Sequence, residues 1–118
     1  MSENLLYVQT SGTDTRLYSP FVLAQTAKAM GIDATIYFLG MGITVLKKGA
    51  AEKIQLGSFP TLKEILDQTA AAGVKIMVCE ASCQLIGLEK GDFIPEADIV
   101  GAATLNDLVL EADGTMWF

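Results

Sequence analysis

The chain has 118 residues and contains no histidine, and only two of its residues are cysteines. Without histidine there is neither a Ser-His-Asp nor a Cys-His pair to activate a nucleophile, and no imidazole to bind a metal ion. These absences exclude most hydrolase and zinc-enzyme mechanisms, and we expect no metal site. Any covalent chemistry must therefore use a thiol, a carboxylate, a hydroxyl or a backbone group.

Basic side chains are also scarce. The chain has 8 lysines and arginines against 14 aspartates and glutamates, which gives a net charge of −6, and its largest basic cluster is the pair Lys47 and Lys48. A protein of negative net charge repels phosphate backbones and anionic lipid headgroups. We therefore expect neither nucleic acid nor a membrane as a partner.

Long apolar runs are missing as well, since nowhere do about 18 apolar residues follow one another without interruption, as a membrane-spanning helix requires. The segment Met1-Ser2-Glu3-Asn4 lacks the basic and apolar parts of a signal peptide. We therefore expect a cytoplasmic protein. In that compartment thiols stay reduced, so the two cysteines are expected to be core or reactive residues rather than a structural disulfide.

Hydrophobic residues nevertheless make up 51% of the chain, which is enough for one core without disulfide or metal staples. Short runs of strand-forming residues occur at 5–9, 35–39, 74–79, 97–100 and 115–118. Segments with helical spacing or helix signals lie between them, at 16–30, 43–48, 61–73, 80–88 and 105–112. Strands that alternate with helices pack as parallel neighbours joined by helical crossovers. We therefore predict one α/β domain over residues 1–118, a three-layer α/β/α sandwich with a mostly parallel sheet of about five strands.

Two of the predicted helices have a capping signal at their start. Thr61 and Glu64 have the spacing of a capping box, in which each side chain accepts a backbone N–H of the other residue. Thr104 is expected to cap the helix that covers Leu105 to Ala112, with Asp107 near its positive end.

In open parallel sheets, ligands and reactive groups gather at the carboxyl ends of the strands. This rule selects three segments: Gly12–Asp14, Gly40–Gly42 and Cys79–Cys83. The first lacks the glycine spacing of dinucleotide and P-loop sites, so we interpret it as a loop and cap. In the second, the glycines are interpreted as turning the chain, and Lys47 and Lys48 beyond them as favouring a helix dipole; the alternative is that the two lysines place positive charge near Cys79.

The third segment carries both thiols. Cys79 closes a predicted strand and stands near the start of a helix, where backbone N–H groups and the helix dipole stabilise a thiolate. Cys83 lies one helical turn further on, so the two sulfurs could come within bonding reach. Glu80 opposes thiolate formation unless its side chain points to solvent. The alternative is that either cysteine is simply a core residue, which for Cys83 is the favoured interpretation.

The spacing of Cys79 and Gly87 resembles the DsrE/DsrF-like sulfur-relay family, in which a strand-end cysteine is followed eight residues later by glycine. Further segments resemble the family in their order along the chain: Ser11-Gly12 before a helix that ends at Gly31, Gly42–Gly49, and Gly101–Thr104 before the last helix. The resemblance covers nearly the whole chain.

This resemblance implies a small α/β subunit that assembles as a homo-oligomer, often a trimer or hexamer, and carries sulfur as a cysteine persulfide. Cys79 is the position that inherits this role. Cys83 matches a second cysteine of some members, either as an acceptor of the sulfur or as a resolving thiol. The implied partners are sulfur donor and acceptor proteins. Exchange of sulfur between thiolates needs no cofactor, so the lack of histidine is no obstacle.

The sequence thus favours a sulfur carrier or sulfurtransferase-like subunit, and two alternatives stay open. One is a non-catalytic oligomeric subunit that binds a ligand or a partner and whose cysteines are buried. The other is a thiol peroxidase, although a peroxidatic site usually places an arginine and a hydroxyl around its thiolate. An ordinary pKa of Cys79 would favour the binding subunit, and rapid formation of sulfenic acid would favour the peroxidase.

Overall fold

The structure of the chain is a computed structural model that describes residues 3–118. Residues 1 and 2, on which the interpretation of the amino terminus partly rests, lie outside this range. Five strands form one sheet in the order β4-β3-β2-β1-β5, and every pair of neighbours is parallel. The strands are β1 (Asn4–Gln9), β2 (Asp33–Phe38), β3 (Lys75–Cys79), β4 (Ala97–Val100) and β5 (Gly114–Trp117).

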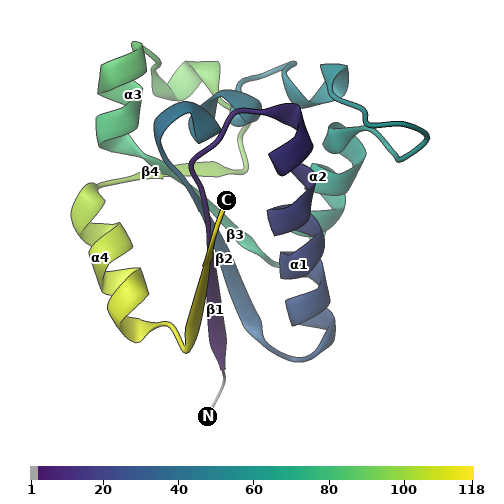
Figure 1. The fold of residues 1–118 in the computed structure, drawn as a ribbon. Helices are drawn as coiled ribbons and strands as arrows, with labels where there is room; N and C mark the ends of the chain where they lie inside the picture. Colours follow the sequence, from purple (N-terminus) through teal and green to yellow (C-terminus); the bar gives the residue numbers. More distant parts are fainter. Residues whose placement is uncertain (1–2) are drawn as a thin grey trace.

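Helices cover both faces of this sheet (Figure 1). The α-helices are α1 (Tyr18–Ala29), α2 (Leu62–Ala71), α3 (Glu80–Ile86) and α4 (Ala102–Glu111). α1 and α2 lie against one face, α4 lies against the other, and α3 follows directly at the carboxyl end of β3. The predicted three-layer sandwich with a parallel five-stranded sheet is confirmed. None of the helices between residues 3 and 118 is long and apolar enough to cross a lipid bilayer.

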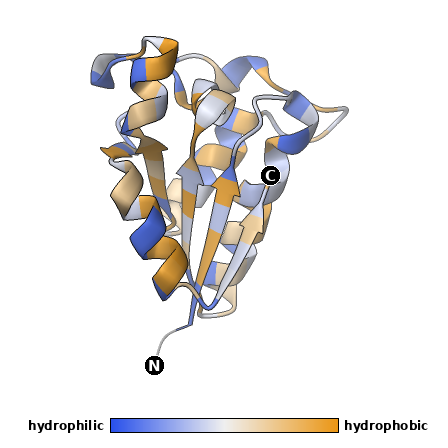
Figure 2. Cartoon of the chain, turned by 60° about the vertical axis from the view of Figure 1, so that its left-hand side comes forward, coloured by the Kyte–Doolittle hydropathy of each residue, from blue (hydrophilic) through white to orange (hydrophobic). Residues whose placement is uncertain are grey.

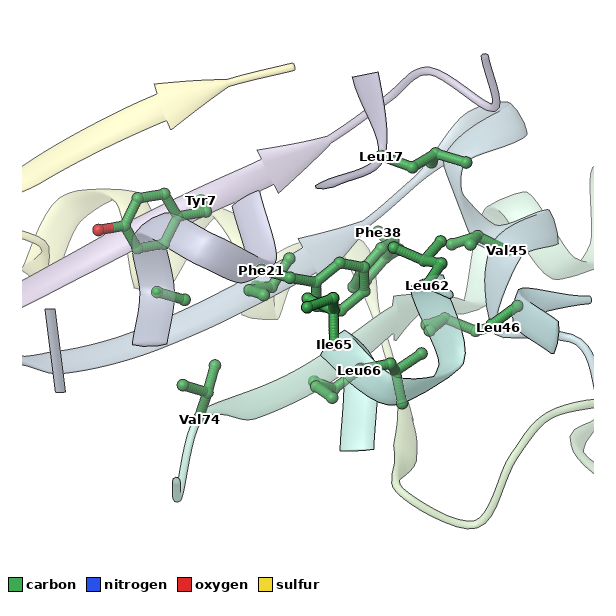
Figure 3. Packing of buried hydrophobic residues seen from close by; sticks show 14 of the residues in the cluster. Tyr7, Leu17, Phe21, Phe38, Val45, Leu46, Leu62, Ile65, Leu66 and Val74 are labelled. Carbon is green, nitrogen blue, oxygen red and sulfur yellow. The ribbon is translucent and has the colours of Figure 1, made fainter. Parts of the chain in front are cut away.

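Successive side chains of a strand point to opposite faces, so the sheet divides the core into two hydrophobic clusters. The larger cluster lies between the sheet and the two helices α1 and α2, and Figure 3 shows Phe38 of the sheet packed between Phe21 of α1 and Leu62 of α2. The smaller cluster lies on the face of α4. It consists of Leu6, Val8, Tyr37 and Cys79, with partly buried residues of α4 packed against it.

Short 3-10 helices connect several elements: η1 (Asp14–Arg16), η2 (Gly40–Leu46), η3 (Ala51–Lys53) and η4 (Lys90–Asp92). η2 replaces the helix expected at 43–48; it starts three residues earlier and ends before the two lysines. The 3-10 geometry fits a short connector, because its tighter turns need fewer residues than an α-helix.

The two predicted caps have different outcomes. At α2, the Thr61 hydroxyl accepts the N–H of Glu64 over 3.4 Å, which is one half of the expected capping box. At α4, the prediction that Thr104 is the cap is wrong. The helix starts at Ala102 with Gly101 as its N-cap, and Thr104 lies inside the first turn, where its N–H donates to the Gly101 carbonyl. Ala102 and Ala103 are strong helix formers, so the helix extends past the threonine.

Candidate functional site

The three segments selected at the carboxyl edge of the sheet do meet there. The N–H of Gly42 donates to the Thr10 carbonyl over 3.1 Å, which ties η2 to the end of β1. A side chain at Gly42 would overlap the Gln9 carbonyl, so only glycine allows this close approach. The N–H of Gly40 donates to the Ser82 hydroxyl over 2.8 Å and so ties the end of β2 to α3. The glycines of this edge therefore do more than turn the chain, because they join three strand ends.

Cys79 is the last residue of β3 and the N-cap of α3, as the sequence predicted. Its backbone is extended, with φ −71° and ψ 119°, so the helix begins with the next residue. The side chain is 7% exposed and packs in the smaller hydrophobic cluster with Leu6, Val8 and Tyr37. The thiol therefore lies under the surface of the carboxyl edge, on the face of the sheet that α4 covers.

The surroundings of Cys79 favour its thiolate. Burial of the sulfur raises the pKa of the Cys79 thiol, but hydrogen bonds from the Ser82 hydroxyl and N–H, the Tyr37 hydroxyl and the Ala81 N–H outweigh burial and leave this pKa below its usual value. All four donors favour the charged sulfur. The neighbouring Glu80 side chain is exposed and is not among the groups that shift the pKa of Cys79.

Cys83 has the opposite electrostatics. Its side chain is 5% exposed and belongs to the larger hydrophobic cluster. Burial, followed by the charge on Cys79, raises the pKa of the Cys83 thiol above its usual value, and its own backbone N–H only partly offsets this. Both cysteines are free, and their side chains belong to different clusters. The pKa values of the two thiols therefore shift in opposite directions, and the two side chains pack in different clusters.

The eight-residue spacing between Cys79 and Gly87 has a simple structural meaning, because these two residues cap α3 at its two ends. Gly87 adopts the left-handed conformation, with φ +81°, that only glycine enters freely. Its N–H and that of Leu88 both donate to the Cys83 carbonyl, over 2.8 and 2.9 Å. The spacing thus fixes the length of the helix that carries both thiols.

Sequence reasoning missed two residues of this site, Tyr37 and Ser82. Tyr37 is fully buried, and its hydroxyl donates to the Gly101 carbonyl over 3.2 Å. Burial and the neighbouring Cys79 raise the pKa of Tyr37 far above its usual value, so the phenol keeps its proton. Ser82 could have been found as a hydroxyl in the first turn of a helix that starts at a cysteine. Nothing in the sequence around Tyr37 distinguishes it from an ordinary core residue.

The other candidate residues lie apart from this chemistry. The backbone of Lys47 forms an isolated antiparallel β-bridge with that of Phe93, and the N–H of Lys48 donates to the Asp92 carbonyl. Neither lysine is among the groups that shift the pKa of Cys79. The acidic side chains around Gly91 and Pro95 are all exposed: Glu89, Asp92, Glu96 and Asp98. Within residues 3–118, no three histidine, cysteine or acidic side chains gather into a group that could hold a metal ion.

Several known proteins are similar to this chain in sequence. An uncharacterised protein of Methanocaldococcus jannaschii is 29% identical over 104 residues, which cover 86% of this chain but only 38% of that protein. A second uncharacterised protein of the same organism is 31% identical over 106 residues, 87% of either chain. Sulfur carrier protein DsrE2 of Allochromatium vinosum is 22% identical over an alignment of 151 residues that covers 94% of this chain and 95% of DsrE2.

Solved structures share the fold. YchN of E. coli superposes with a TM-score of 0.75 over the whole of both chains at 16% identity. A protein of unknown function from Methanobacterium thermoautotrophicum superposes with a TM-score of 0.81, over 99% of this chain and 100% of that one, at 12% identity. A family model described as DsrE/DsrF-like matches residues 3–118. The resemblance seen in the order of the sequence motifs is thereby confirmed, and the chain belongs to the DsrE/DsrF-like family.

Proposed function

We propose that this protein is a sulfur carrier in which Cys79 takes up and passes on sulfane sulfur as a persulfide. The observation that carries the proposal is the position of Cys79, which is the last residue of β3 and the N-cap of α3 at the carboxyl edge of a parallel sheet, and the pKa of its thiol is lowered there. The relative named sulfur carrier protein DsrE2 and the family membership support the same role.

The transfer needs only thiolate exchange. The Cys79 thiolate attacks the outer sulfur of a donor persulfide, R–S–SH; the donor S–S bond breaks, a new S–S bond forms on Cys79, and the donor leaves as R–S⁻. Discharge is the same reaction with an acceptor thiolate, which leaves Cys79 as a thiolate again. No net oxidation occurs in either step, so no cofactor is required. The partners are a persulfide-bearing donor and a thiol-bearing acceptor, both taken to be proteins.

We propose that Cys83 is a second thiol that does not take up sulfur during loading. If the Cys83 thiolate attacked the inner sulfur of a Cys79 persulfide, a Cys79–Cys83 disulfide would form and hydrosulfide would leave. The raised pKa of Cys83 keeps this thiol protonated while Cys79 is charged, which protects the stored sulfur from that release. Cys83 is therefore not needed for loading.

The two rival functions differ from this proposal in observable ways. A binding subunit with inert thiols is consistent with the burial of both cysteines, but it requires an ordinary pKa of Cys79, and that pKa is lowered. A peroxidase is expected to use an arginine and a hydroxyl around its thiolate, and of these two groups the arginine distinguishes it here. Arg16, the one arginine of the sequence, is exposed and is not among the groups that shift the pKa of Cys79. The lowered pKa of Cys79 and the position of Arg16 both favour the carrier over these two alternatives.

Loading with inorganic polysulfide followed by intact-mass measurement tests the proposal. The wild-type chain and the Cys83→Ser variant are expected to gain the mass of one sulfur, and the Cys79→Ser variant none; cyanide, which removes sulfane sulfur, should reverse the gain. An unchanged mass in the wild type, or an equal gain in Cys79→Ser, would refute the carrier role. Rapid sulfenic acid at Cys79 with low peroxide and no sulfur gain would support the peroxidase instead.

We further propose a homo-oligomeric, cytoplasmic protein with one domain over residues 1–118. The support for oligomerisation comes from the outer edge of β5 and the adjoining surface of α4. Trp117 is 54% exposed and Leu110 is 84% exposed, and together with Leu105 and Val109 they line one hollow. Figure 2 shows the hydrophobic last turns of α4 on this surface.

The two edges of the sheet differ in a way that favours contact between copies at β5. The β4 edge has Asp98 in the strand and follows Pro95 and Glu96, which are the usual means of blocking an exposed edge. The residues Gly114–Trp117 include neither a charge nor a proline. A Trp117→Lys variant should therefore lower the mass measured by sedimentation equilibrium, and Asp98→Lys on the β4 edge should not. An unchanged mass in Trp117→Lys would exclude this interface.

A further inference from the structure

The outer edge of β5 carries backbone groups that no strand of this chain binds. β5, the yellow strand that ends at the C-terminus in Figure 1, is last in the sheet order, and within residues 3–118 it pairs with β1 alone. The N–H of Phe118 donates to the Val8 carbonyl over 2.8 Å, and the Phe118 carbonyl accepts the N–H of Thr10 over 2.6 Å. Backbone groups of successive strand residues alternate in direction, so those of Thr115 and Trp117 point away from β1.

No feature of β5 blocks this edge. Natural sheets protect an exposed edge with a charge, a proline or a bulge. The residues Gly114–Trp117 have neither charge nor proline, and their register with β1 is regular. Large apolar side chains are exposed on both sides of the strand. Trp117 pairs with Val8 and lies on the α4 face, and Met116 pairs with Tyr7 and lies on the α1 face. An edge with these properties calls for a covering strand.

α4 turns an uncharged side toward the same edge. The helix residues that line the hollow beside Trp117 are Leu105, Asn106, Val109 and Leu110. The two acidic residues of α4, Asp107 and Glu111, do not line it and lie one turn apart on another side of the helix. Asp113, just before β5, accepts the N–H of Asn4 over 2.7 Å within the chain.

This distribution of charge favours a second copy of the chain as the occupant. Each copy has a net charge of −6, so two copies repel each other except where their contact surface is free of acidic side chains. The outer edge of β5 and the facing side of α4 form such a surface. A partner that recognised this acidic protein by its charge would instead contact carboxylates.

Antiparallel pairing of two β5 strands uses every outward backbone group. In a hydrogen-bonded antiparallel pair, two opposite residues exchange both of their N–H···O=C bonds. When Thr115 of one copy lies opposite Trp117 of the second copy, the reciprocal pair forms as well. Met116 of one copy then lies opposite Met116 of the other, on a two-fold axis. A register that places Thr115 or Trp117 opposite itself leaves half of the outward groups unpaired.

The side chains fit the same register. The Trp117 indole N–H donates to the Thr115 hydroxyl over 3.3 Å within one chain, so both side chains lie on the α4 face. Across the axis, the large Trp117 therefore faces the smaller, β-branched Thr115, a favourable cross-strand pair. On the other face two flexible Met116 side chains meet. A two-fold axis normal to the sheet keeps α4 of both copies on one face, so the two hollows adjoin.

We propose that β5 pairs antiparallel with β5 of a second copy, with Thr115 opposite Trp117, so that two sheets of five strands continue as one. The inference rests on the proposed homo-oligomer and adds the contact and its symmetry. A two-fold contact gives a dimer, or it joins two trimers into a hexamer, but it does not occur within a trimer alone. The assembly therefore contains an even number of copies.

The first test removes one outward N–H. In Thr115→Pro the lost N–H has no partner inside the chain, and proline is tolerated in an edge strand at such a position. This variant is expected to halve the mass measured by sedimentation equilibrium and to unfold cooperatively in denaturant. Thr115→Val keeps the N–H and is the matched control, which should retain the wild-type mass. An unchanged mass in Thr115→Pro, or an equal loss in Thr115→Val, would overturn the pairing.

The second test fixes the register and does not depend on a proline variant folding. Each new cysteine is placed in the Cys79→Ser, Cys83→Ser double variant and oxidised with diamide. Met116→Cys should form a covalent dimer, because opposite residues of a non-hydrogen-bonded pair have Cα atoms about 4.5 Å apart, within the range of a disulfide. Thr115→Cys is the control: its diagonal partner lies about 7–8 Å away, too far for the bond. No dimer in Met116→Cys, or equal dimer in Thr115→Cys, would refute this register.

These outcomes separate the pairing from the functions proposed above. A chain in which Trp117→Lys lowers the mass, but Thr115→Pro does not, has copies that meet at this surface without joining their sheets, which overturns the pairing alone. A wild-type chain that sediments as a monomer would refute both the homo-oligomer and the pairing. Sulfur loading is read from the mass of the single chain, so a failure of the carrier role is seen independently of either result.

Discussion

Cys79 and Cys83 are the same residue type, one helical turn apart and buried almost equally, at 7% and 5% exposure. Nevertheless, the pKa of Cys79 is lowered and that of Cys83 is raised. Burial opposes the ionisation of both thiols, so burial cannot account for the difference. The difference in pKa comes from the hydrogen bonding around Cys79, which Cys83 lacks apart from its own N–H.

The supply of donors differs because the two residues hold different positions in α3. At a helix start the first N–H groups have no partner within the helix, and those of Ala81 and Ser82 lower the pKa of Cys79. Cys83 lies further along, where N–H groups are used in the helix itself. A hydrogen bond to a charged group contributes about 1.5–3 kcal/mol, and one pKa unit corresponds to about 1.4 kcal/mol. A few donors are therefore enough to reverse the effect of burial.

The largest change in the difference between the two thiols is expected when the segment that holds Ser82 is displaced. In Gly42→Ala the new side chain would overlap the Gln9 carbonyl, so η2 must shift and carry the Gly40 N–H away from Ser82. We expect a loss of about 2–3 kcal/mol in the free energy of unfolding, as for an overpacked core. Alkylation of Cys79 should slow, and that of Cys83 should not. Denaturant unfolding and thiol labelling check both effects, and a variant as stable as the wild type would contradict the close packing at Gly42.

Thiol labelling of the native protein measures the comparison directly. At about pH 7, iodoacetamide should modify Cys79 at least about tenfold faster than Cys83, because each pKa unit changes the thiolate fraction tenfold below the pKa. Peptide mass spectrometry assigns the two adducts. In denaturant the two rates should become similar, which provides the control. Equal rates in the native state would show that burial, and not the donors, controls both thiols.

Much of this architecture could be predicted from the sequence, because it rests on local patterns. Short apolar runs between helical segments predicted the parallel sheet, and Cys79 was placed correctly at the start of a helix. The errors have local causes too. Thr104 predicts a helix cap because threonine is common at that position, but the alanines before it extend the helix back to Gly101.

The donors around Cys79 were harder to predict because they come from pairings between distant segments. Tyr37 packs in one cluster with Cys79 only because β2 and β3 are parallel neighbours in a register that pairs Tyr37 with Met77. The Ser82 hydroxyl is held in place by the N–H of Gly40, which belongs to a segment distant in the sequence. A hydrophobic pattern predicts that a tyrosine is buried, but it does not predict what its hydroxyl meets.

A smaller effect is expected at the carboxyl end of α3, where the Cys83 carbonyl accepts two N–H groups. Gly87→Ala forces alanine into a left-handed conformation with nothing within 4 Å of the new side chain, so only backbone strain is added. We expect a loss of about 1–2 kcal/mol in the free energy of unfolding. Gly101→Ala is the matched control, since the space there is also open but φ is −77°. It should be close to neutral.

The Gly87 variant also sharpens the comparison of the thiols. The N–H groups of Gly87 and Leu88 both bind the Cys83 carbonyl, so loosening this end should speed labelling of Cys83. Cys79 takes its donors from the other end of the helix and should keep its pKa. A slower Cys79 in Gly87→Ala would mean that the two ends of α3 are not independent.

The smallest expected effect is the pH dependence of stability, in which the two thiols act in opposite directions. The pKa of Cys79 is lower in the folded chain than in the unfolded one, so its ionisation stabilises the fold; this contribution is complete above the unfolded pKa of about 8.5 and is lost as the pH falls through the folded pKa. The pKa of Cys83 is raised, so its contribution is complete below about 8.5 and is lost as the pH rises through the folded pKa.

Urea unfolding under reducing conditions between about pH 7 and about pH 10, the range that brackets the unfolded thiol pKa, separates the two contributions. Relative to the wild type, Cys79→Ser should lose stability progressively as the pH rises, and Cys83→Ser should gain it. The raised pKa values of Tyr7 and Tyr37 also change the stability at alkaline pH, and comparison with the wild type at each pH removes the part common to all three proteins.

The two thiols are also coupled. Because the charge on Cys79 contributes to the pKa shift of Cys83, the change in stability of the double variant should differ from the sum of the changes in the single variants. Parallel stability profiles for both single variants would mean that the two thiols share one environment, contrary to the separation on which the proposed carrier role depends.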